Sequence, residues 1–525
     1  MSKEFFIGKK DELKNGEMKE VEAGDHKLLL SRIDDKYYIV DAHCNHYGAP
    51  LKDGVLSGER VVCPWHHAVF NAKTGKALDG PAIDDIPALE VQIKEKDLIV
   101  ELPEEYEGFK IPDMVAPDKP KSDHVFVIIG GGAAGNMAAQ TLREDGFEGR
   151  LIMISEDERL PYDRPNVSKE YLSGEAPKEW MTLRSEDFYD KYKIELMMNN
   201  RVSNINTENY QITYEQGTLA YHRALIATGG SPVKLDLPGA DLENIMYLRS
   251  YTDADRLIDA QEGKKNIKII GASFIAMETA DSLTKRGHKV TVIAPELVPF
   301  EKVFGTDIGA LFKEAHKQQG VDFKLGRKPK EFKGEGKVEK IVLDNGETYD
   351  ADLVIIGVGI EPNADISGNV RPNDEGSLDV DKYLRISNDV YAAGDVARYV
   401  DRRTGEKQRI EHWRTAHQQG QVAALNMNGR TIEYKAIPFF WTRQAGLSIK
   451  YLGHAKKWDE IIFAGNVEDK KFLAYYVKDK KVHAVAGMNM HKAMAAIEEL
   501  MRMEKMPLVS KLDEIDILEY FESVK

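Results

Sequence analysis

The chain has 525 residues, enough for about three domains at roughly 100–200 residues each. Charged residues make up 30% and the formal net charge is −15, a balance that disfavours nucleic acid and anionic membrane surfaces as partners. No apolar run is long enough to span a bilayer, and the start MSKEFFIGKKDEL lacks the apolar core of a secretory signal, so we expect a cytoplasmic protein without a transmembrane segment.

Only two cysteines are present, and each lies close to a histidine in a loop marked by glycine or proline. HCNHYGAPL contains Cys44 and His46, and CPWHHAVF contains Cys63 and His66. Two thiolates and two imidazoles suit either zinc or a [2Fe–2S] cluster. Because each loop supplies one ligand of each kind, the spacing favours a Rieske centre, in which two cysteines hold one iron and two histidines the other. Structural zinc is the alternative.

The two loops resemble those of Rieske ferredoxin-type domains, with which they also share G-x-P-L and C-P-W-H. The resemblance implies that Cys44, His46, Cys63 and His66 hold a [2Fe–2S] cluster. Around the loops, KLLLSRIDDKYYIV and LEVQIKEKDLIVEL predict two β-hairpins. We therefore expect residues 1–105 to form an all-β Rieske domain. Residues 106–122, rich in proline and charge, are expected to be a linker.

A dinucleotide fingerprint follows in HVFVIIGGGAAGNMAAQTLREDG. Gly130, Gly132 and Gly135 form G-x-G-x-x-G between a β-branched run and a helical segment, and a second apolar strand ends at Glu156. The glycines let the backbone approach a pyrophosphate at the helix N-terminus, and the acidic residue takes ribose hydroxyls. This order of elements predicts a first dinucleotide site.

The segment NIKIIGASFIAMETADSLTKRGHKVTVIAPE repeats the same frame in a degraded form. Gly271 is followed by Ser273 and Ala276 where glycines are usual, and the Ser273 hydroxyl is expected to be able to meet a phosphate. The second strand ends at Ala294, so Glu296 is expected to replace the usual acidic residue. No arginine cluster follows that would clamp a 2′-phosphate, which favours NADH over NADPH. A nucleotide fold without its nucleotide is the alternative.

Five more segments match, in sequence order, the motifs of two-dinucleotide flavin reductases: PYDRPNVSK, LIATGG, IIGVGIEPN, VYAAGDVARY and EHWRTAHQQG. The chain resembles the ferredoxin and rubredoxin reductases and, with its N-terminal domain, the Rieske-containing, apoptosis-inducing-factor-like oxidoreductases. The resemblance implies a multidomain fold with two α/β three-layer, Rossmann-like domains. FAD is expected at residues 123–250 and 380–430, NAD(P)H at residues 251–379, and a C-terminal α+β domain at residues 431–525.

The resemblance also implies a role for each matched residue. Three residues are the catalytic candidates near the flavin: Lys169, Glu278 and Trp413. Of these, Lys169 is expected to approach the flavin N5 atom and to pair with Glu278. The expected FAD-binding residues are Gly130, Gly132, Gly135, Glu156, Arg164, Lys169, Gly394, Asp395, Glu411, His412 and Trp413. The expected NAD(P)H-binding residues are Gly271, Ser273, Ala276, Glu278, Glu296, Gly357 and Gly359. Trp441 matches a family tryptophan near the flavin ring.

Disulfide reductases of similar architecture need a cysteine beside the flavin, and residues 164–171 contain none. We therefore predict an NAD(P)H oxidoreductase that passes electrons from NADH through FAD to its Rieske cluster and on to an unknown acceptor. A slow NADH-responsive redox sensor and electron flow from the cluster to NAD are the alternatives. The acceptor, a protein or a small molecule, is left open, as is the oligomeric state, with a homo-oligomer among the options.

Overall fold

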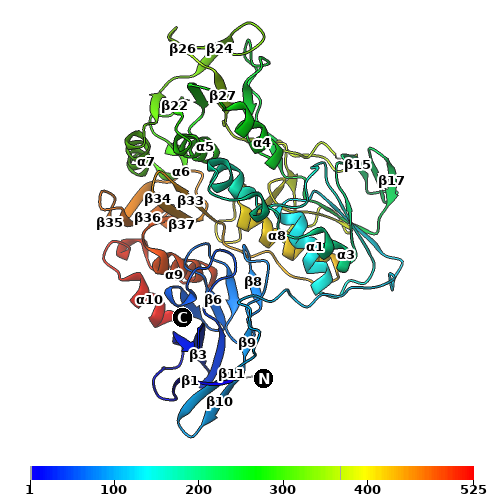
Figure 1. The fold of residues 1–525 in the computed structure, drawn as a ribbon, viewed down its shortest axis with the longest axis vertical. Helices are drawn as coiled ribbons and strands as arrows, with labels where there is room; N and C mark the ends of the chain where they lie inside the picture. The colour runs from blue at the N-terminus through cyan, green and yellow to red at the C-terminus, as the bar shows by residue number, and fades with distance from the viewer. Residues whose placement is uncertain (1–2, 367) are drawn as a thin grey trace.

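The computed structural model describes residues 3–366 and 368–525, so two residues of the expected Rieske domain and one of the expected NAD(P)H domain lie outside the described residues. The N-terminal part, blue in Figure 1, forms three antiparallel sheets. In sheet order, their strands are β1 (Lys3–Lys9), β11 (Asp97–Leu102) and β10 (Val91–Lys94); β2 (Met18–Ala23), β3 (His26–Ile33), β4 (Lys36–Asp41) and β9 (Ala88–Leu89); and β5 (Val55–Ser57), β6 (Arg60–Val62), β7 (Val69–Asn71) and β8 (Ala77–Asp79).

Both hairpins expected in this region are confirmed. Strands β3 and β4 turn at Asp34 and Asp35, whose φ angles of 51° and 61° suit a two-residue hairpin turn. Strands β10 and β11 turn at Glu95, which also has a positive φ angle. The first cysteine–histidine loop follows β4, and the second connects β6 to β7.

A parallel five-stranded sheet comes next, with the first fingerprint at its centre. The strand order is β14 (Ile194–Met197), β13 (Arg150–Ile154), β12 (Val125–Ile129), β18 (Arg223–Ile226) and β30 (Val390–Ala392). These strands are largely buried, as expected for a parallel sheet covered on both faces. Helices α1 (Ala133–Glu144) and α8 (Trp413–Met427) pack on the sheet and on each other, and α2 (Glu170–Ser173) and α3 (Glu186–Lys191) lie in the connection after β13.

Three small sheets flank this one. They contain β15 (Val202–Asn206), β16 (Gln211–Tyr214) and β17 (Gly217–Ala220); β19 (Gly230–Pro232) and β28 (Ile360–Pro362); and β29 (Leu378–Asp379), β31 (Ala397–Val400) and β32 (Lys407–Arg409). The chain therefore leaves the first parallel sheet after β18 and returns to it through β30, once a second unit has been built.

That second unit, green in Figure 1, repeats the parallel design. Its sheet has the order β20 (Ile245–Tyr247), β27 (Leu353–Ile356), β21 (Asn266–Ile270), β22 (Lys289–Ala294) and β23 (Asp322–Leu325). The helices are α4 (Tyr251–Ala260), α5 (Phe274–Lys285), α6 (Glu301–Phe304) and α7 (Thr306–Gln318). A small antiparallel sheet of β24 (Pro329–Lys333), β25 (Lys340–Leu343) and β26 (Thr348–Asp350) completes it.

The C-terminal part is an antiparallel sheet followed by two helices, which makes it α+β as expected. Its elements are β33 (Phe439–Gln444), β34 (Leu447–Gly453), β37 (Lys481–Met488), β36 (Lys471–Lys478) and β35 (Glu460–Asn466), then α9 (His491–Arg502) and α10 (Ile517–Val524). The sheet lies between the second parallel unit and the N-terminal domain, with α9 and α10 beside the latter (Figure 1). No helix in the described ranges is both long and apolar enough to cross a membrane.

The N-terminal domain is docked firmly against the rest of the chain. Val55, Val62 and Val69 share one apolar core with Phe439 of β33 and with residues of α9. The linker therefore joins parts that already share a buried interface.

Candidate functional site

The two cysteine–histidine loops bring their four ligand candidates together in like pairs. Cys44 and Cys63 are each 1% exposed, and their thiols face each other as hydrogen-bonding partners. The Nδ1 atoms of His46 and His66 lie 3.1 Å apart. Burial lowers the pKa of His46 to about 3 and that of His66 well below its usual value, so both imidazoles are neutral, the form that binds metal.

This arrangement fits a Rieske cluster, in which two cysteines hold one iron and two histidines hold the other. The backbone N–H groups of Trp65 and His66 also point to the Cys63 sulfur, where they stabilise a thiolate.

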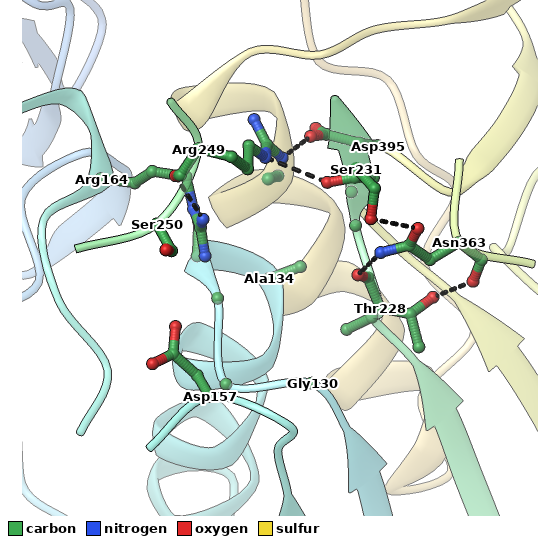
Figure 2. A pocket seen from close by; sticks show the side chains of 18 of the residues that line it. Gly130, Ala134, Asp157, Arg164, Thr228, Ser231, Arg249, Ser250, Asn363 and Asp395 are labelled. Carbon is green, nitrogen blue, oxygen red and sulfur yellow. Dashed lines mark hydrogen bonds and ion pairs between the residues drawn. The ribbon is translucent and has the colours of Figure 1, made fainter. Parts of the chain in front are cut away.

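A cavity of about 1180 Å³ runs from the first fingerprint loop to the C-terminal sheet. Eleven of the predicted residues line it: Gly130, Gly132, Glu156, Arg164, Lys169, Glu278, Gly394, Asp395, Glu411, His412 and Trp413. Figure 2 shows one end of this cavity, where Gly130 and Ala134 face Arg249 and Asp395 across the open space. The size and the polar rim suit a dinucleotide.

Each glycine of the first fingerprint is needed for a different structural reason. Gly130 has a φ angle of +111°, and a Cβ atom there would lie 2.2 Å from the Ala227 carbonyl oxygen. A Cβ atom on Gly132 would meet nothing within 4 Å, so this position leaves room for a ligand at the start of α1. Gly135 does not line the cavity. Its Cβ would lie 1.9 Å from the Gly130 carbonyl oxygen, so this glycine permits close packing of helix and strand.

Lys169 and Glu278 form a buried ion pair, with 2.9 Å between Nζ and Oε2. Ser168 donates to Oε2 of Glu278, and Thr442 of β33 donates to Oε1, each over 2.7 Å. One carboxylate therefore connects the 164–169 segment, helix α5 and the C-terminal sheet. With these three partners its charge is held at a fixed place beside the cavity.

Asp395 is held by a residue that the sequence motifs did not single out. Arg249 donates to its Oδ2 over 2.5 Å, and donates also to the Gly230 carbonyl (Figure 2). Thr228, Ser231 and Asn363 form a second hydrogen-bonded set on the same wall. The LIATGG and IEPN motifs marked these segments, but not the side chains that meet.

The remaining predicted FAD residues differ in their surroundings. Glu156 is 67% exposed and pairs with Arg201 at the cavity mouth. Burial raises the pKa of Glu411, whose carboxylate pairs with Arg409. Burial lowers the pKa of His412 to about 3, so its imidazole is neutral against Phe440.

The second fingerprint is built around Gly357. Gly271 has a φ angle of +107°, and a Cβ there would lie 2.4 Å from the Gly357 carbonyl oxygen. The Ser273 hydroxyl caps α5 and donates to that same oxygen over 2.7 Å, so its proton is used within the protein rather than pointing at a phosphate. A Cβ on Gly357 would crowd Ala276, and Gly359 has a φ angle of +128°. Glu296 pairs with Lys302 over 2.9 Å.

The cluster loops approach the large cavity through Trp441. Trp441 lines the cavity, and its ring centroid lies 4.2 Å from that of His66 and 6.2 Å from that of His46. Tyr47, beside His46, donates to Asp163 over 2.9 Å and accepts from Asn166 over 2.8 Å. The sequence singled out Trp441, whereas no motif marked Tyr47 as an inter-domain contact.

Residues 124–420 match the family model described as pyridine nucleotide-disulphide oxidoreductase. The chain belongs to this family. Residues 3–90 also match the Rieske [2Fe-2S] domain model, and residues 439–516 match the reductase C-terminal model. Both cysteines of this pyridine nucleotide-disulphide oxidoreductase lie in the Rieske loops, so none is present beside the large cavity.

Similar proteins match this chain over different lengths. Apoptosis-inducing factor 3 of Homo sapiens is 33% identical over 502 residues, which cover 93% of this chain and 82% of the relative. The 3-phenylpropionate/cinnamic acid dioxygenase ferredoxin–NAD(+) reductase component of Photorhabdus laumondii is 31% identical over 389 residues, or 72% of this chain and 96% of the relative. A crystal structure of the covalent putidaredoxin reductase–putidaredoxin complex has a TM-score of 0.72 at 26% identity, covering 77% of this chain and 99% of that chain.

The matched models and relatives establish the protein as an FAD-dependent oxidoreductase of the ferredoxin-reductase type that uses a pyridine nucleotide and carries a Rieske [2Fe–2S] cluster. Its fold is the expected combination of an all-β Rieske domain, two Rossmann-like domains and a C-terminal α+β domain.

Proposed function

We propose that the protein takes electrons from NADH at the flavin, transfers them within the same chain to the Rieske cluster, and delivers them singly to an external acceptor. When bound, FAD would supply two-electron hydride chemistry and the [2Fe–2S] cluster one-electron transfer. The single observation that carries this proposal is the position of Trp441, which lines the large cavity and touches the His66 ring.

The proposed roles of the residues follow from their contacts. Cys44 and Cys63 would hold one iron, and His46 and His66 the other. Lys169 would place a positive charge beside the flavin, fixed there by Glu278. A cation at that position favours the anionic, reduced form of a flavin.

FAD would lie in the large cavity, with its pyrophosphate at Gly130 and Gly132, its ribityl chain at Gly394 and Asp395, and its ring near Lys169 and Trp413. Arg164, Glu156, Glu411 and His412 would complete this site. Gly271, Ala276, Gly357, Gly359 and Glu296 would receive the nicotinamide dinucleotide. We also propose a cytoplasmic location, because thiolate ligands such as Cys44 and Cys63 persist in reducing compartments.

An anaerobic titration of the purified holoprotein with NADH tests the route. We expect the flavin absorbance to bleach and the EPR signal of a reduced Rieske cluster to develop within the same titration. The Cys63→Ser variant is the matched control: its flavin should bleach as in the wild type, without the cluster signal. Bleaching with no EPR signal in iron-replete wild-type protein would contradict transfer within the chain. Formation of NADH when the oxidised holoprotein receives NAD⁺ and a reduced one-electron donor would favour the opposite direction of flow.

A further inference from the structure

Lys450 of β34 is a buried cation between the C-terminal sheet and the second cluster loop, and only 3% of it is exposed. Its Nζ atom donates to the carbonyl of Pro64, the residue that directly follows Cys63. The same atom lies 2.5 Å from Nδ1 of His491, the first residue of α9. Burial lowers the pKa of His491 to about 4, so its imidazole is neutral and its Nδ1 atom can accept from the ammonium. Two neutral acceptors, one from each domain, therefore hold this ammonium in place.

The strand register places Lys450 on the side of the sheet that meets the cluster loops. Lys450 pairs with Trp441 of β33, and residues directly opposite each other on neighbouring strands point to the same face. The ring centroid of Trp441 lies 4.2 Å from that of His66. One face of the C-terminal sheet therefore contacts the second loop twice, with a cation at Pro64 and an aromatic ring at His66.

This buried cation has no carboxylate partner within residues 3–366 and 368–525, where its polar contacts are the Pro64 carbonyl and His491. A buried charge is costly unless an opposite charge lies nearby. The Rieske cluster can supply that charge. With two ferric ions, two sulfides, two thiolates and two neutral imidazoles it has no net charge, and one added electron makes it negative. The reduced cluster is therefore the state that Lys450 stabilises.

We propose that the Lys450 ammonium raises the reduction potential of the Rieske cluster, so that a residue of the C-terminal domain favours electron transfer from the flavin to the cluster. The inference rests on the proposed function, because it concerns the cluster that receives the electron. In this step one electron leaves the reduced flavin and enters the cluster, and Lys450 gives up neither a proton nor an electron. Net charge around an iron–sulfur cluster is one of the properties by which a protein sets its potential.

The test is an equilibrium titration of the holoprotein with dithionite and mediator dyes at pH 6, followed by the EPR signal of the reduced cluster. Burial lowers the pKa of Lys450 to about 7, an effect that the Cys63 charge opposes, so the ammonium form prevails at that pH. Lys450→Gln removes the charge but keeps a donor for the Pro64 carbonyl. We expect the equilibrium constant for cluster reduction to fall about tenfold, or about 59 mV for one electron. Lys450→Arg, which keeps the charge, and Lys481→Gln, at an exposed position of β37, should retain the wild-type potential.

An unchanged potential in Lys450→Gln would overturn the inference, as would an equal fall in Lys450→Arg. Altered g values in Lys450→Gln would show that the loop has moved, and would also overturn it, because a charge effect leaves the ligand geometry unchanged. If Lys450→Gln does not assemble the cluster, Lys450→Met, which fills similar space without a charge, replaces it in the comparison. Dithionite reduces the cluster without NADH, so the two proposals fail separately. A cluster that NADH cannot reduce contradicts the proposed function, while the lowered potential of the variant would still support the role of Lys450.

Discussion

Glu278 is the residue on which the surroundings of Lys169 depend. Its two carboxylate oxygens accept from Ser168 and Thr442, and one of them also pairs with the Lys169 ammonium. Both charged side chains are nearly buried, so neither charge is well solvated without the other. The fixed charge beside the cavity is therefore a property of the pair rather than of Lys169 alone.

Replacing Glu278 with Gln tests this dependence at constant shape. The amide keeps one hydrogen-bond acceptor but loses the charge, so Lys169 is no longer held in place. We expect flavin reduction by NADH to slow by about 10–100-fold, the equivalent of one lost charge-assisted hydrogen bond. Stopped-flow absorbance under anaerobic conditions gives the rate. Glu175→Gln, which removes an exposed carboxylate paired with Lys285, should leave it unchanged. An unaltered rate in Glu278→Gln would show that the Lys169–Glu278 pair does not contribute to flavin reduction by NADH.

Helix α9 fixes the Rieske domain against the reductase. Its Glu498 lies 2.5 Å from His67 of the second cluster loop and 2.7 Å from Arg414 of α8. Burial alone would raise the pKa of Glu498, but Arg414 and His67 lower it to about 2, so the carboxylate is ionised at neutral pH. Arg414 also donates to the Gly80 carbonyl of the Rieske domain. Three parts of the chain therefore meet at one buried carboxylate.

The variant Glu498→Gln should weaken this docking. Removing one partner from a buried ion pair costs about 3–5 kcal/mol, because the Arg414 charge is left without a counterion. We expect NADH to reduce the flavin at the wild-type rate, while the cluster becomes reduced more slowly. Rapid-freeze EPR combined with stopped-flow absorbance separates these two steps. The exposed Glu504→Gln on the same face of the chain serves as the control. If both steps slow equally in Glu498→Gln, the variant has a general folding defect and the docking role is wrong.

At the scale of the whole molecule, the interface between the Rieske and FAD parts contains a carboxyl group with a raised pKa. Glu144, at the end of α1, lies 3.9 Å from Lys76 and faces Asp84, Asp85 and Arg184. Burial raises the pKa of Glu144 to about 7, an effect that Lys76 opposes and Asp85 supports. In the folded protein this group therefore keeps its proton well above the ordinary range for a glutamate.

A raised pKa in the folded state makes stability fall as the pH rises. Below about pH 4.5, Glu144 is protonated in both the folded and the unfolded chain, and its contribution to the free energy of unfolding is fully present. Between that pH and about 7 the unfolded chain loses the proton first, and the free energy of unfolding declines by about 3 kcal/mol. We expect Glu144→Gln to raise the thermal unfolding midpoint at pH 8 and to change it little at pH 5. A variant that is equally or less stable at pH 8 would contradict the assignment.

Parts of the fold and the site follow from contiguous stretches of sequence. The hairpin at Asp34 and Asp35 is encoded by two neighbouring residues, and the turn at Gly130 by the G-x-G-x-x-G spacing. The four cluster ligand candidates are predicted in the same way, since each loop carries a cysteine and a histidine at short spacing. The limits of the domains and the individual site roles stay predictions.

The motifs alone predict the kinds of chemistry: a Cys₂His₂ cluster, two nucleotide frames in order, and no cysteine beside the flavin. Short motifs suffice for this because they set the local backbone and the ligand atoms together. Which distant groups meet depends on how the domains pack in the folded chain. Arg249 reaches Asp395, and Tyr47 reaches Asp163. These contacts depend on the packing of whole domains, and no local spacing in the chain encodes that packing.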